Sequence, residues 1–194
     1  MMKLLVKALI LIIFCSPALA RPFDYYLSLG PEYWSITSHK DNTDSHLLTG
    51  GFMFRGNLFS KVNAEFRGGT GEISTTRISF NEISLLYNAI YTPTYYLGYG
   101  ISYLTYNNIL NKASNTAINQ SELNAKIQWQ QSFSELWGFY LKLVGPNTIG
   151  YDLGWIAYFD KDLGDFNLHA GYKNVSLAGN SSMHGAYIAS EVYF

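Results

Sequence analysis

Residues 82–106 read EISLLYNAIYTPTYYLGYGISYLTY, and the alternation within this stretch decides the fold. Large apolar side chains occupy every second position of 82–91 and again of 95–106. Side chains of a β-strand alternate between the two faces of a sheet, so a period of two predicts two strands. The residues between them, Thr92-Pro93-Thr94, predict a tight turn and therefore an antiparallel pair.

The same alternation recurs along the chain after residue 22. It predicts ten strands, at 23–34, 47–58, 62–70, 82–91, 95–106, 120–133, 136–143, 149–159, 166–173 and 184–194. Connections after the even-numbered strands are short. Those after the odd-numbered strands are longer and polar, at 38–46, 72–81, 107–119 and 177–183, with 144–148 as a short exception. We therefore predict an all-β fold, an antiparallel up-and-down transmembrane β-barrel of ten strands, with eight strands as the alternative.

The composition excludes two other classes of protein. Charged residues make up 14% of the 194 residues and aromatic residues 16%, which is too apolar for a disordered chain. Lys and Arg number 13 against 14 Asp and Glu, so there is no basic excess for binding nucleic acid. Many Tyr, Gly and Asn residues and few charges instead favour strands and turns.

Residues 1–20, MMKLLVKALILIIFCSPALA, have the pattern of a cleaved signal peptide. Lys3 and Lys7 precede a short apolar run, and Ala18-Leu19-Ala20 forms a small-residue cleavage site. Cleavage after Ala20 leaves 21–194 as the barrel domain. It also removes Cys15, the sole cysteine, so the exported chain is expected to form no internal disulfide.

Periodicity alone does not say which face of the barrel points inward. A lipocalin-like barrel has its apolar face inside, whereas a membrane barrel has it outside. Pairs of aromatic residues stand eight positions apart on the apolar face: Tyr25 and Tyr33, Tyr95 and Tyr103, Tyr151 and Phe159. Eight tilted residues span roughly 19 Å, near the spacing of two interfacial aromatic belts. We therefore predict that the apolar face contacts lipid.

The opposite face carries charges of both signs. They are Glu32, Arg55, Glu65, Arg67, Glu122, Lys126, Lys142, Asp152, Lys173 and Glu191. An unpaired charge in a confined lumen is costly, so we predict an ion-pair network of Glu32, Arg55, Glu65, Arg67, Glu122 and Lys126. Within it, Arg55 and Glu65 are expected to lie opposite each other, with Arg67 and Glu32 beside them. Such a network suits either a filled barrel or a narrow pore.

The end of the chain, GAYIASEVYF at 185–194, has Ile188, Val192 and Phe194 in register. It resembles the C-terminal signature of Gram-negative outer-membrane β-barrels, which the barrel-assembly machinery recognises. The last hairpin, HAGYKNVSLAGNSSMHGAYIAS at 169–190, resembles that of YfaZ-type barrels, and the overall size is similar to that of OmpX/Ail and OmpA barrels. The resemblance implies a place in the outer membrane, with lipid, lipopolysaccharide and the assembly machinery as partners.

Two polar clusters are candidates for a catalytic or a metal-binding site. Asp44 and His46, at i and i+2, could orient a general base as in OmpT-like proteases, but no second carboxylate pair accompanies them. The serine-hydrolase spacing His-x-Ser of PagL is absent at His169 and His184. His39 and Asp41, together with the first pair, fit no closed zinc site. We predict no catalytic residue, no metal and no cofactor.

The function expected from these features is non-enzymatic. The barrel would have a structural role, or would bind an unidentified surface ligand through loops 38–46 and 107–119. A narrow pore for small solutes is the first alternative, and a lipid- or peptide-hydrolysing barrel is the second.

Overall fold

The computed structural model describes residues 28–38, 44–53, 61–73, 76–92, 94–110, 117–159, 165–177 and 182–193. These residues form ten strands. They are β1 (Ser28–Ser38), β2 (Asp44–Met53), β3 (Val62–Ile73), β4 (Thr76–Tyr91), β5 (Tyr95–Leu110), β6 (Ala117–Ser132), β7 (Trp137–Gly145), β8 (Thr148–Phe159), β9 (Asp165–Leu177) and β10 (Ser182–Tyr193). The signal peptide predicted at 1–20 lies outside the described residues.

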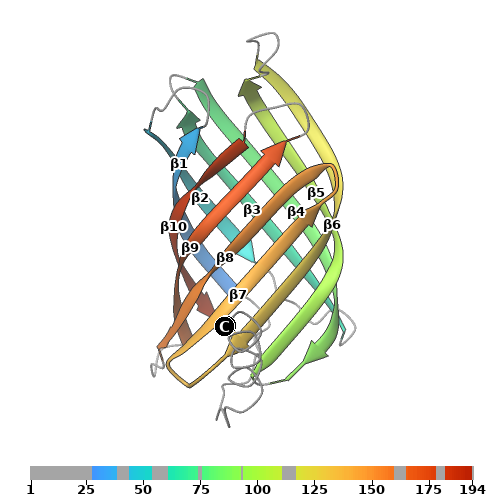
Figure 1. The fold of residues 1–194 in the computed structure, drawn as a ribbon, viewed down its shortest axis with the longest axis vertical. Coiled ribbons are helices and arrows are strands. Elements are labelled where there is room, and N and C mark those ends of the chain that lie inside the picture. The colour runs from blue at the N-terminus through green and yellow to red at the C-terminus, as the bar shows by residue number, and fades with distance from the viewer. Residues whose placement is uncertain are drawn as a thin grey trace, which may run out of the picture.

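Each strand pairs antiparallel with its neighbours in the chain, and β1 also pairs with β10 (Figure 1). The sheet therefore closes on itself as an up-and-down barrel, and the predicted all-β antiparallel class is confirmed. Ser28 lies opposite Tyr193, so we call that end of the barrel the termini end. The opposite end, where β1 leads into β2, is called the β1–β2 end.

The predicted contrast between short turns and long loops is wrong. Segments 72–81 and 107–119 were expected to be loops, yet β3 runs to Ile73, β4 begins at Thr76, and β5 runs to Leu110. Their ladders continue as far as the Ile73–Thr76 and Leu110–Ala117 pairs. These segments are polar because they lie beyond the apolar belt of the barrel, and backbone pairing there needs no apolar face.

The wall of the barrel is uneven in height. β4, β5 and β6 have 16 residues each, whereas β7 has 9. The β6–β7 ladder spans only Ala125–Ser132 of β6, although the β5–β6 ladder continues to Ala117. The rim at the β1–β2 end is therefore high along β4–β6 and drops at the β7–β8 hairpin (Figure 1).

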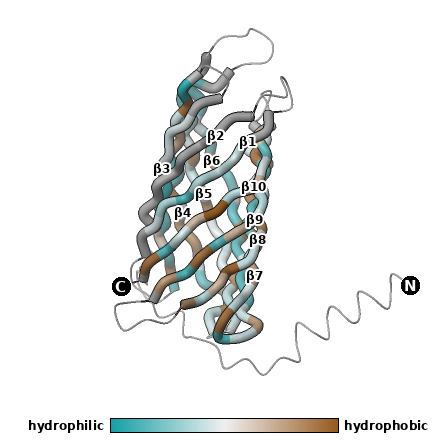
Figure 2. The backbone as a smooth tube through the Cα atoms, turned by 90° about the vertical axis from the view of Figure 1, so that its left-hand side faces the viewer, coloured by the Kyte–Doolittle hydropathy of each residue, from teal (hydrophilic) through white to brown (hydrophobic). Residues whose placement is uncertain are grey.

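The polarity of the barrel is inverted relative to a water-soluble protein. Its exposed large apolar side chains are Tyr33, Phe66, Ile83, Leu85, Tyr87, Ile90, Tyr99, Ile101, Tyr103, Leu123, Ile127, Leu136, Trp137, Leu143, Ile149, Tyr151, Trp155, Phe159, Tyr172 and Ile188. Charged and amide side chains are buried inside. Hydrophilic and hydrophobic residues are interspersed along the strands accordingly (Figure 2), and buried residues alternate with exposed or half-buried ones along β8. The prediction that the apolar face points outward is confirmed.

No helix among the described residues is long and apolar enough to cross a membrane.

Candidate functional site

A buried lysine lies at the centre of the lumen. Lys126 Nζ on β6 is 2.7 Å from Glu65 Oε2 on β3 and 2.7 Å from Glu82 Oε1 on β4. It also donates to Ser84 Oγ at 3.0 Å. The Lys126 and Glu65 side chains are each 1% exposed, so this pair is desolvated and depends on its partners for compensation.

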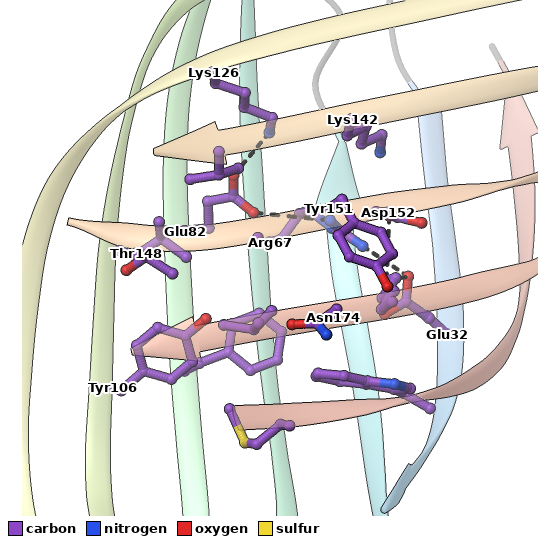
Figure 3. Close-up of a pocket in the computed structure, with 18 of the residues that line it drawn as sticks. Glu32, Arg67, Glu82, Tyr106, Lys126, Lys142, Thr148, Tyr151, Asp152 and Asn174 are labelled. Atoms are coloured by element: carbon purple, nitrogen blue, oxygen red, sulfur yellow. Dashed lines mark hydrogen bonds and ion pairs between the residues drawn. The ribbon is translucent and has the colours of Figure 1, made fainter. Parts of the chain in front are cut away.

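A second group of charges continues from Glu82 across the lumen. Arg67 Nη1 is 3.8 Å from Glu82 Oε2, and Arg67 Nη2 donates to Glu32 Oε2 at 2.7 Å. Glu32 also pairs with Lys173 of β9, whose Nζ is 3.6 Å from Asp152 Oδ2 on β8. Figure 3 shows the contacts from Lys126 through Glu82 and Arg67 to Glu32. These contacts link six strands across the interior. We call the charged side chains that make them the lumen network: Glu32, Glu65, Arg67, Glu82, Lys126, Asp152 and Lys173.

Four residues of the predicted network are brought together by the structure: Glu32, Glu65, Arg67 and Lys126. Glu122 is not in contact with them and instead accepts hydrogen bonds from Gln120 and Thr148. Glu191, also expected inside, lies 3.1 Å from His169 Nε2.

Arg55 lies outside the described residues, and with it the expected Arg55–Glu65 pair. The β2–β3 ladder is described as far as the pair of Gly50 with Gly68. Among the described residues, the carboxylate of Glu65 is in contact with Lys126, from a strand distant in sequence. The pair with Arg55 stays a prediction.

Glu82 is the network residue that the sequence analysis missed. It contacts Lys126, Arg67, Ser84 and Ser102, and so connects the two groups of charges. Its position on the polar face of 82–91 was the available signal, because alternation placed it beside Ser84 inside the barrel.

Packed side chains fill the termini half of the lumen. Tyr96 is 1% exposed and accepts a hydrogen bond from Asn63 Nδ2 at 3.2 Å, and Asn63 accepts one from Asn88. The Tyr96 ring lies over Gly98, where a Cβ atom would be 2.2 Å from Tyr96 Oη. Glycine at this position therefore leaves the space that the ring occupies.

Tyr158 of β8 occupies the same half, three strands away from β5 in the sheet. Its Oη shares a hydrogen bond of 2.8 Å with Ser132 Oγ and accepts one from Gln130 Nε2 at 3.3 Å. A Cβ atom at Gly138 would lie 2.5 Å from this oxygen. We call Tyr96 and Tyr158, together with their hydrogen-bond partners Asn63, Gln130 and Ser132, the plug.

The other half of the lumen contains a pocket. It has a volume of about 720 Å³, including space open to solvent, and the lumen network forms part of its lining (Figure 3). Its apolar lining includes Trp34, Ile78, Phe80, Leu104, Tyr106 and Met183. All six come from the parts of β1, β4, β5 and β10 nearest the β1–β2 end. Continuing the alternation through segments assigned to loops would have placed Ile78 and Phe80 inside.

Lys142 of β7 also lines the pocket, but it takes no part in the ion pairs. Within the described part of the chain its ammonium group has no hydrogen bond or ion pair, and it lies 5.7 Å from the centre of the Tyr140 ring. Its cross-strand neighbour Asp152 is in contact with Tyr140 Oη at 2.8 Å and with Lys173.

Only some of the residues considered as enzymatic or metal-binding candidates lie among the described residues. Asp44 and His46 lie on β2, where their backbones pair with Thr37 and Ser35, and their side chains lie outside the description. His39 and Asp41 are outside the described residues altogether. Among the residues that are described, no group of three or more His, Cys, Asp or Glu is arranged to hold a metal ion.

The predicted assembly signal lies on β10. Ile188 points outward with 54% of its surface exposed, and Val192 is half-buried. Phe194 lies outside the described residues.

No protein-family model matches the sequence, and a search of curated proteins finds no similar chain. Among solved structures, an outer membrane channel from Pseudomonas putida F1 aligns with 91% of this chain and 98% of its own, at 11% sequence identity and a TM-score of 0.43. A likeness at that score does not establish a common fold.

Proposed function

We propose that this chain is an outer-membrane β-barrel, exported by a cleaved signal peptide, whose closed lumen serves a binding role and not free diffusion. The observation that carries the proposal is the inverted polarity, with aromatic and aliphatic side chains around the outside and ionised groups within. Soluble monomers rarely expose contiguous apolar patches larger than a few hundred Å². A bilayer is the solvent that suits such a surface.

The orientation follows from the two ends of the barrel. Outer-membrane barrels have short periplasmic turns and longer extracellular segments. The long strands β4, β5 and β6 extend beyond their neighbours at the β1–β2 end. We therefore place this end outside the cell and the termini end in the periplasm. The pocket then opens toward the cell surface, and the plug faces the periplasm.

The plug favours a non-conducting barrel. Tyr96 is 1% exposed, and Gln128 of β6, which pairs with Gly98, is fully buried. An aqueous path past these groups would leave them wetted. A binding or structural role at the surface is therefore the first candidate.

A gated narrow pore is the second candidate. Polar and charged side chains of one strand follow the lumen down to the plug, from Glu122 through Lys126 to Gln130. Displacement of the plug would join them into a continuous hydrophilic path.

The location is tested by fractionation. The protein should sediment with the outer membrane and migrate differently on a gel before and after boiling, because folded barrels resist detergent. A cysteine introduced at Asn119, near the β1–β2 end, should react with an impermeant maleimide on intact cells. A cysteine at Glu135, in the turn at the termini end, should react only after lysis. A soluble periplasmic protein with identical migration before and after boiling would contradict the proposal.

A further inference from the structure

The pocket combines two features that a purely structural lumen does not need. Nine aromatic and aliphatic side chains line it, whereas lumens of membrane barrels are mostly polar. Small-molecule sites have this composition, with a mainly apolar lining and a few polar groups that fix orientation. The apolar lining therefore fits a ligand with a hydrocarbon or aromatic body.

The charges around the pocket are unequally engaged. The three acidic residues of the lining already have cationic partners: Glu32 with Arg67 and Lys173, Glu82 with Lys126, and Asp152 with Lys173. Lys142 alone among the four cationic residues of this lining has no ion pair within the described residues. A cationic ligand would have to displace an existing pair, whereas an anionic ligand would complete one.

We infer that this pocket binds a small amphipathic monocarboxylate, with its carboxylate at Lys142 and its apolar body against Trp34, Leu104 and the neighbouring apolar side chains. A single uncompensated ammonium group matches one negative charge better than two. Lysine is a compact point charge and does not require the bidentate geometry that arginine provides. This inference rests on the proposed function, because it names the class of ligand that the closed lumen binds.

The experiment compares three probes with one hydrocarbon chain and different head groups: octanoate, 1-octanol and octylammonium. Each is titrated calorimetrically into the full-length protein in lipid nanodiscs, and the heats from empty nanodiscs are subtracted. Lys142→Met removes the charge while retaining an apolar stem, and Lys142→Arg retains the charge. Lys61→Met is the matched control, because Lys61 is exposed in the turn before β3 and does not line the pocket.

The wild type and Lys61→Met should bind octanoate at least tenfold more tightly than either other probe. Lys142→Met should lose this preference, and Lys142→Arg should retain most of it. Equal affinity for the three probes, an unchanged preference in Lys142→Met, or no saturable binding by the wild type would overturn the inference. The comparison of the three probes on the wild-type protein tests the inference even if a variant does not fold. A barrel that inserts normally and does not bind would leave the proposed location intact.

Discussion

Lys126 provides the ammonium group that two buried carboxylates share, those of Glu65 and Glu82. Lys126→Met leaves the buried carboxylates of Glu65 and Glu82 without their shared cation. Breaking a buried pair by removing one partner costs about 3–5 kcal/mol. We expect the free energy of unfolding, from urea titration in lipid vesicles, to fall by this amount.

The double variant Lys126→Met/Glu65→Gln provides the test of coupling. It should recover part of the lost stability, because only Glu82 then lacks the cation. Lys61→Met, at an exposed turn, should change stability by less than about 0.5 kcal/mol. Strictly additive effects of Lys126→Met and Glu65→Gln would show that the two groups are hydrated independently.

Gly98 is under steric constraint from the Tyr96 ring. A methyl group at this position would lie 2.2 Å from Tyr96 Oη, so Gly98→Ala must displace the ring. We expect the variant to lose about 1–3 kcal/mol of stability in the same urea titration, as overpacked interiors do. Gly145→Ala is the control, because no atom lies within 4 Å of a Cβ placed there. Equal losses for the two variants would mean that the contact with Tyr96 has no part.

For individual residues, the alternation of the sequence could predict which side chains face the lumen but not which of them form ion pairs with each other. Glu32, Glu65, Arg67 and Lys126 were all assigned correctly to the interior. The partners depend on how far a long side chain reaches across the barrel, and Lys126 crosses to two strands that are not its neighbours in the sheet. Only closure of the barrel determines that distance.

The outward face of β5 gives a prediction for a single element. Ile101 is 51% exposed on a strand that we place in the bilayer. Ile101→Arg should destabilise the barrel by about 2–4 kcal/mol, the range for arginine facing lipid near the midplane. Unfolding titrations in vesicles would measure the loss.

Leu136 offers the matched control for this substitution. It is 72% exposed in the turn between β6 and β7 at the termini end, beyond the strands. Leu136→Arg should cost about 0–1 kcal/mol, because charges near the interface remain hydrated. Similar losses at Leu136 and Ile101 would argue against a lipid environment around β5.

Strand positions were predicted well where one face is apolar. The ranges 95–106, 149–159 and 166–173 all fall inside observed strands. The errors occur at the β1–β2 end, where 72–81 and 107–119 are mostly strand. In 72–81 the alternation of Ile78 and Phe80 was a signal that the prediction did not use. The polar ends of β5 and β6 are held by their backbone ladder, and a hydrophobic pattern contains little signal for such pairing.

For the molecule as a whole, the plug predicts that the barrel does not conduct ions. Planar bilayers containing the wild-type protein should show no stable conductance at moderate voltage. Tyr96→Ala/Tyr158→Ala should give measurable steps, because it removes both rings from the termini half of the lumen. Tyr106→Ala, which alters only the pocket half, should remain silent. A conducting wild type would favour the gated pore over a closed barrel.

The uneven height of the wall has a consequence for how a ligand arrives. β7 and β8 form the low side of the rim, and Val144, Thr148 and Gly150 of that hairpin line the pocket. A molecule dissolved in the outer leaflet therefore meets a shorter barrier there than along β4–β6. Its supply would depend on its concentration in lipid more than in water. In the proposed orientation, such a ligand would therefore reach the pocket across the rim at the β7–β8 hairpin.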